Sequence, residues 1–60
     1  SYSYTLHKFF QIIGLHEFAK YFPLLKSTDK LRQQDDIFKK IVGYMSQNDT
    51  TTKWVFYPSI

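Results

Sequence analysis

The longest helical pattern in the chain lies in residues 36–45, which read DIFKKIVGYM. Apolar positions recur there at intervals of three and four, the spacing of one face of an α-helix. That face consists of Ile37, Phe38, Ile41, Val42 and Met45. We therefore expect a helix over residues 29–46, in which Gly43 either costs stability or marks an early end.

Two clusters of capping residues accompany this pattern. Ser27-Thr28-Asp29 and Asp35-Asp36 both offer side-chain oxygens to the free N–H groups of a helix start. Consecutive residues diverge by about 100° on a helix, so Asp35 and Asp36 cannot act as a paired acid and base. We expect them to cap the strongest part of the helix and to complement its dipole.

Two shorter helical patterns precede this one. Leu6, Phe9, Phe10 and Ile13 form one apolar stripe, with Thr5 as the expected N-cap and Gly14 as the left-handed end, which predicts a helix over residues 6–13. The same spacing begins again at Leu15, and Pro23 stops it, which predicts a helix over residues 15–21. A single continuous helix with a kink at Gly14 is the alternative. The expected core is Leu6, Phe9, Phe10, Ile13, Leu15, Phe18, Leu24, Phe38, Ile41 and Val42.

Both ends of the chain have patterns typical of extended structure. Residues 1–5 alternate small polar residues with tyrosine, and residues 53–57 are rich in β-forming and aromatic side chains. We expect the tail to be ordered, either paired with the N-terminal segment as a small β element or laid across the helices. The fold class is thus mostly α, with three short helices at 6–46, extended aromatic-rich ends, and a loop from residue 47 to the tail.

Length and composition limit the remaining possibilities. Residues 1–60 make a single small helical domain or a fragment of one, with a net charge of +3, 20% aromatic residues and no cysteine. Disulfides and thiolate metal sites are therefore excluded, and the absence of cysteine favours an intracellular setting. A domain this short is marginally stable alone, so a larger partner is expected. No stretch has the roughly 20 apolar residues of a membrane span.

Catalytic patterns are missing. The two histidines, His7 and His16, lie on different predicted helices, whereas zinc needs three or four converging ligands. Gly14 and Gly43 are the only glycines, so there is no glycine-rich phosphate loop. We predict no enzyme, no metal, no cofactor and no small-molecule substrate.

Two binding functions remain open. The first is a non-catalytic assembly module that docks onto a larger protein or complex through aromatic side chains, as interfaces often do. The partner-binding residues would be Trp54, Phe56, Tyr57, Tyr2 and Tyr4. The alternative is direct binding of DNA or RNA by dispersed cations. Those residues would be Lys26, Lys30, Arg32, Lys39, Lys40 and Lys53.

Two stretches also resemble known families. Residues 9–22, FFQIIGLHEFAKYF, look like the first helices of sterile-alpha-motif domains. Residues 18–24 with Lys30 and residues 37–42 are similar to the C-terminal part of a LAGLIDADG homing-endonuclease repeat. The signature helix with its metal-binding acid has no counterpart here, so no catalytic residue is carried over. This second resemblance implies a non-cutting remnant in a nucleoprotein assembly.

Overall fold

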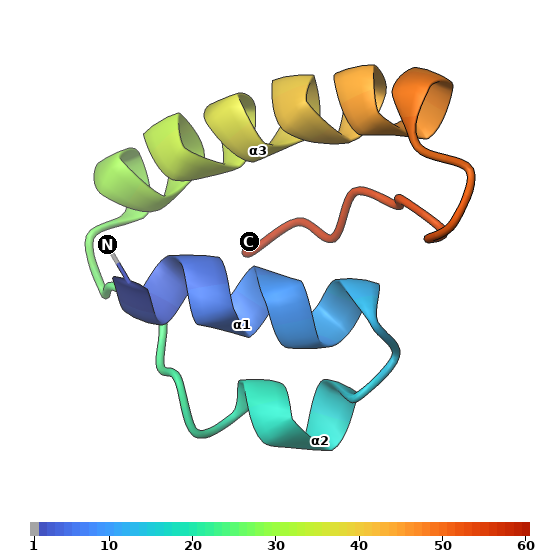
Figure 1. Ribbon diagram of the computed structural model, residues 1–60. Coiled ribbons are helices and arrows are strands. Elements are labelled where there is room, and N and C mark those ends of the chain that lie inside the picture. Colours follow the sequence, from blue (N-terminus) through green and yellow to red (C-terminus); the bar gives the residue numbers. More distant parts are fainter. Residues whose placement is uncertain (1) are drawn as a thin grey trace.

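The computed structural model describes residues 2–60 and contains three helices. These are α1 (Tyr2–Ile12), α2 (His16–Ala19) and α3 (Thr28–Asn48). In Figure 1, α1 lies between α2 and α3, and the C-terminal tail turns back after α3. The prediction of a mostly helical chain with three helices is confirmed. Residues 2–60 contain no strand, so the described ends do not pair as a β element.

Helix α1 starts earlier than its sequence pattern indicates. The extended N-terminal segment and the Thr5 cap were wrong, since the helix already includes Tyr2 and Thr5; Ser1 lies outside the described residues. The alternation of serine and tyrosine is overridden by tertiary contacts. The Ser3 hydroxyl donates a 2.7 Å hydrogen bond to the Pro23 carbonyl, and Tyr4 is buried in the core.

Gly14 ends α1 as predicted. Its φ of +81° is left-handed, a conformation that glycine adopts without steric cost. The N–H of Gly14 donates to the Gln11 carbonyl at 3.1 Å, and that of Leu15 donates to the Phe10 carbonyl at 2.9 Å. This pair of bonds is a Schellman motif. It reverses the chain so that α2 folds back on α1.

A small aromatic cluster joins α2 and its following loop to α1. The ring of Phe10 stacks on Phe22 at 5.4 Å and packs against Phe18 at 5.9 Å. The Nδ1 atom of His7 is 2.9 Å from the Phe22 carbonyl oxygen, which accepts a hydrogen bond when that nitrogen is protonated. α2 is shorter than the predicted helix at 15–21, and it ends at Ala19 before the turn into Pro23.

Helix α3 supplies most of the core. Ser27 occupies its N-cap position, and the helix continues through Gly43 to Asn48. Asp35 and Asp36 were wrongly predicted to cap a helix start, because both lie inside α3. The core cluster consists of Tyr4, Leu31, Phe38 and Val42, with Ile12, Leu24, Trp54, Phe56 and Tyr57 packed against it.

The predicted core was only partly right. Phe38 and Val42 are buried and Leu24 is partly buried. The other predicted positions are half-buried or exposed: Leu6, Phe9, Phe10, Ile13, Leu15, Phe18 and Ile41. The reason is the orientation of α1. The face of α1 that packs toward α3 carries Tyr4, Lys8 and Ile12, and not the most apolar stripe of α1. A lysine can occupy that face because its ammonium finds partners inside.

The C-terminal tail, residues 49–60, runs back along the helices, between α3 and α1 in Figure 1, and has no helix or strand of its own. The rings of Phe56 and Phe38 are 5.5 Å apart, and those of Tyr57 and His16 are 5.4 Å apart. The Trp54 indole N–H donates to Asp49 Oδ2 at 3.0 Å. Among residues 2–60, no helix combines the length and apolar character needed to cross a bilayer.

Candidate binding surfaces

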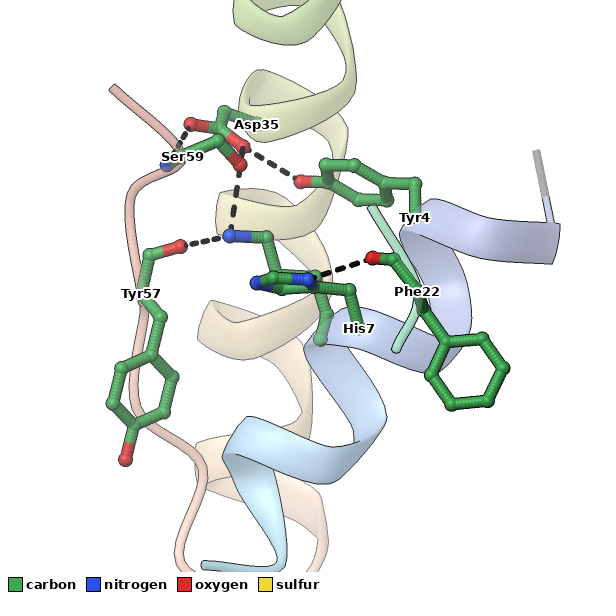
Figure 2. A network of polar contacts seen from close by, with 7 residues as sticks. Tyr4, His7, Phe22, Asp35, Tyr57 and Ser59 are labelled. Carbon is green, nitrogen blue, oxygen red and sulfur yellow. Dashed lines mark hydrogen bonds and ion pairs between the residues drawn. The ribbon is translucent and has the colours of Figure 1, made fainter. Parts of the chain in front are cut away.

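Asp35 is the centre of a buried polar network that holds the tail (Figure 2). The Ser59 backbone N–H donates to Asp35 Oδ2 at 2.7 Å, and the Ser59 hydroxyl donates to Oδ1 at 2.6 Å. The Tyr4 hydroxyl also donates to Oδ1, at 2.8 Å. One carboxylate on α3 therefore connects the first turn of α1 with the end of the chain.

Lys8 completes this network from α1. The residue is 3% exposed, and its Nζ donates to the Tyr57 carbonyl oxygen at 2.6 Å. The same Nζ is 4.0 Å from Asp35 Oδ1. It also lies 5.4 Å and 5.5 Å from the ring centres of Tyr4 and Phe38, within the range of cation–π attraction. A buried ammonium is costly without such partners.

The network shifts the pKa of each of its titratable groups. Burial tends to raise the pKa of Asp35, but the hydrogen bonds from Ser59 and Tyr4, with the charge of Lys8, outweigh it and hold the pKa below its ordinary value. Burial lowers the pKa of Lys8, and the charge of Asp35 only partly offsets this. The pKa of Tyr4 is raised, mainly by burial, and further by the hydrogen bond to Asp35 and the negative charge of Asp35.

The lowered pKa of Asp35 predicts a loss of stability in acid. As the pH falls below the ordinary aspartate pKa of 3.8, the unfolded chain takes up a proton at residue 35 before the folded chain does. The free energy of unfolding should therefore decrease as the pH falls toward and through the lower folded pKa. Urea denaturation at neutral and acidic pH measures this. Asp35→Asn keeps an acceptor but cannot titrate, so its pH profile should be flatter; an unchanged profile would exclude Asp35 as the source.

An apolar groove of about 440 Å³ lies between α1 and α3. We call it the α1–α3 groove. Its walls include four side chains that are 43–60% exposed, although large and apolar. They are Phe9 and Ile13 on α1, with Ile37 and Ile41 on α3. Trp54 lines the groove, but no residue after it does.

The predicted partner-binding aromatics occupy different environments. Tyr4 is buried and lines the α1–α3 groove. Trp54, Phe56 and Tyr57 are half-buried and pack against the core cluster. Tyr2, at the start of α1, is 89% exposed. The structure thus brings four of these residues together around the core cluster and leaves Tyr2 in solvent.

The predicted nucleic-acid-binding cations are all exposed. Four of them lie on α3, Lys26 precedes it, and Lys53 follows it. Arg32 and Lys39 are seven residues apart, so they lie on one side of the helix, about 10.5 Å apart along its axis. Among residues 2–60, the only ion pair within 4.0 Å is that of Lys8 and Asp35, so none of these six cations is paired with a carboxylate.

The sequence interpretation missed both the network and the groove. It assigned Phe9, Ile13 and Ile41 to the core and gave Lys8 no role. A signal was nevertheless present: Lys8 is four residues after Tyr4, and Asp35 is four residues after Leu31, which places each charge on a buried face. Opposite charges on the inward faces of two helices indicate an ion pair, but only once it is known that these two helices pack against each other.

Comparison with known proteins places the chain in a family. The sequence profile of the family described as "Poxvirus Late Transcription Factor VLTF3 like" matches residues 1–54. The chain belongs to this family. The chain is 45% identical over 60 residues, its whole length, to a putative transcription factor of Acanthamoeba polyphaga mimivirus. It is 49% identical over 41 residues, 68% of its length, to a putative transcription factor of Paramecium bursaria Chlorella virus 1.

The matched part is small in each relative. It amounts to 12% of the mimivirus protein and 11% of the chlorella-virus protein. No match to the chain was found among solved structures. The VLTF3-like membership corrects both resemblances to the sterile alpha motif and the LAGLIDADG repeat, which were wrong. The prediction that the chain is not an enzyme is confirmed, because the family is one of transcription factors.

Proposed function

We propose that this VLTF3-like chain is a binding part of a viral transcription factor and contacts nucleic acid through α3. Membership of a transcription-factor family supports a role at DNA or RNA. The observation that carries the proposal is the set of exposed cations on and beside α3, none of them in an ion pair with a carboxylate. Binding phosphates would provide the counter-charges that this surface lacks.

Arg32, Lys39 and Lys40 form the centre of the proposed contact. Each is exposed on α3, and the tail does not bury them, although Lys39 lies 6.0 Å from the ring centre of Phe56. Asp36 lies between them in sequence and reduces the local positive charge. With a net charge of only +3, we expect modest affinity from few phosphate contacts.

The test is the salt dependence of binding. Association of the chain with labelled duplex DNA and single-stranded RNA is measured by fluorescence anisotropy between about 50 and about 200 mM salt. Each cation that binds a phosphate contributes about one unit to the slope of log affinity against log salt concentration. Replacing Arg32, Lys39 and Lys40 by alanine should reduce the slope by about three units and weaken binding to all sequences alike.

Lys20→Ala is the matched control. Lys20 is exposed and follows α2. Its replacement by alanine changes the net charge by the same amount as Lys39→Ala. The control should leave the slope nearly unchanged. If Lys20→Ala and Lys39→Ala had equal effects, binding would follow net charge and not the surface of α3. If neither DNA nor RNA bound at low salt, the proposal would fail.

Docking onto a protein of a transcription complex is the second candidate function. The exposed apolar walls of the α1–α3 groove favour it, because surface patches of this kind mark interaction sites. Trp54 and Tyr4, two of the predicted partner-binding residues, line that groove. Capture of partners with and without nuclease separates the candidates, since a partner retained after nuclease does not depend on nucleic acid.

A further inference from the structure

We propose that the α1–α3 groove binds an acidic amphipathic helix of a partner protein. This inference rests on the docking function proposed above. It concerns the flank of α3 that carries Ile37 and Ile41, whereas Arg32 and Lys39 lie on the opposite flank. Shape and charge both point to this occupant.

The walls of the groove are spaced for a helix. Phe9 and Ile13 are four residues apart on α1, and Ile37 and Ile41 are four residues apart on α3. Each pair therefore presents neighbouring apolar side chains on one helix face. Along α1 the groove residues run from Thr5 to Ile13, a rise of about 12 Å. This length holds two turns of a third helix, with apolar anchors at i, i+4 and i+7.

No carboxylate lines the groove. Of the five acidic residues in the chain, Asp35 is buried in the tail network, and Glu17 lies on α2. Asp29 and Asp36 come one residue before Lys30 and Ile37, which lie on the groove side of α3. Their positions are therefore rotated by about 100° around the helix, away from the groove. Asp49 stands near the Trp54 end, but its carboxylate accepts hydrogen bonds from Trp54 and Thr51.

The charges near the groove are basic. Lys30 is seven residues before Ile37, so it lies on the same side of α3, at the start of the groove. Thr52 and Trp54 line the groove, and the exposed Lys53 is adjacent to both in the chain. An apolar helix with acidic residues beside its anchors would complement this surface, whereas a basic helix would be repelled. A charged, phosphate-rich nucleic acid does not fit the apolar walls.

The tail leaves this surface open. Lys8 and Asp35 hold the Tyr57 carbonyl and Ser59, and no residue after Trp54 lines the groove. Among residues 2–60, no segment of the chain covers Ile37, which is 60% exposed. Residues 2–60 of the same molecule therefore do not fill the groove, and the proposed occupant belongs to a partner.

Two synthetic peptides test the proposal. The acidic peptide is an alanine-based helix with leucines at i, i+4 and i+7 and glutamates between them; the basic peptide replaces every glutamate by lysine. Each is titrated into the isotopically labelled chain and followed by NMR chemical shifts. We expect the acidic peptide to bind at least about tenfold more tightly, with shifts concentrated at Phe9, Ile13, Ile37, Ile41 and the Trp54 indole.

Exposed apolar residues provide matched variants. Ile37→Ser with Ile41→Ser removes one wall of the groove without touching a buried side chain, and it should weaken binding of the acidic peptide at least about tenfold. Leu25→Ser with Ile60→Ser makes the same chemical change at exposed positions outside the groove and should leave binding unchanged. Circular dichroism is used to check that both double variants remain folded.

Any one of the following results would overturn the groove assignment: equal binding of both peptides, no binding of either, full affinity in the Ile37/Ile41 variant, or concentration-dependent shifts at the groove in the free chain. The last result would identify a second copy as the occupant. Shifts at Phe56 and Tyr57 instead would also reject the groove, but they would leave the docking function standing.

Discussion

Asp35→Ala should destabilise the chain by about 3–5 kcal/mol and release the tail, because it leaves the buried Lys8 ammonium without its counter-charge. The same change removes the acceptor of the Ser59 and Tyr4 hydrogen bonds. A domain of this size rarely has more than about 3–5 kcal/mol of stability in total. We therefore expect most of the variant to be unfolded at room temperature, as measured by urea denaturation followed by circular dichroism and Trp54 fluorescence.

Two further variants make this prediction specific. Asp36→Ala, at the adjacent exposed position of α3, should change the free energy of unfolding by less than about 0.5 kcal/mol. Lys8→Met combined with Asp35→Asn removes both charges, keeps an acceptor for Ser59 and Tyr4, and should be more stable than Asp35→Ala. If Asp35→Ala and Asp36→Ala lowered the free energy of unfolding equally, the network around Asp35 would not be what stabilises the fold.

Phe38→Ala should cost about 3–5 kcal/mol, the range for removal of a buried phenylalanine ring. Phe38 is 6% exposed, and its ring lies 6.4 Å from Tyr4 and 5.5 Å from Phe56. The cavity would therefore open between α1, α3 and the tail at once. We expect cooperative thermal melting, followed by circular dichroism at the helix band, to be lost.

Ile37→Ala is the control for this second variant. It lies next to Phe38 on α3 but is 60% exposed, so its truncation should change the melting temperature little. If Phe38→Ala melted like the wild-type chain, the core assigned to α3 would be wrong. If both variants lost cooperative melting, the loss would not be specific to the buried ring, because alanine is the stronger helix former at both positions.

In the tail, the local sequence pattern explains why the segment is ordered, and the tertiary structure explains where it lies. Trp54, Phe56 and Tyr57 within four residues predicted an ordered segment, since leaving such rings in water is unfavourable. Pattern alone left open whether the tail pairs with the N-terminal residues or crosses the helices. The choice depends on Lys8 and Asp35, which bind the Tyr57 carbonyl and Ser59 and so align the tail along the helices.

The sequence by itself determined the local elements: three helices, the apolar face of α3 with Phe38 and Val42, and the left-handed end of α1 at Gly14. Spacing and backbone sterics are local properties, and they suffice for these features. Only the tertiary structure decided which face of α1 is inside. Burying Lys8 is unfavourable unless Asp35 and the tail supply partners, and those partners lie 27 and 49 residues away in the chain. That distant pairing turns Phe9 and Ile13 outward, and with them it creates the α1–α3 groove.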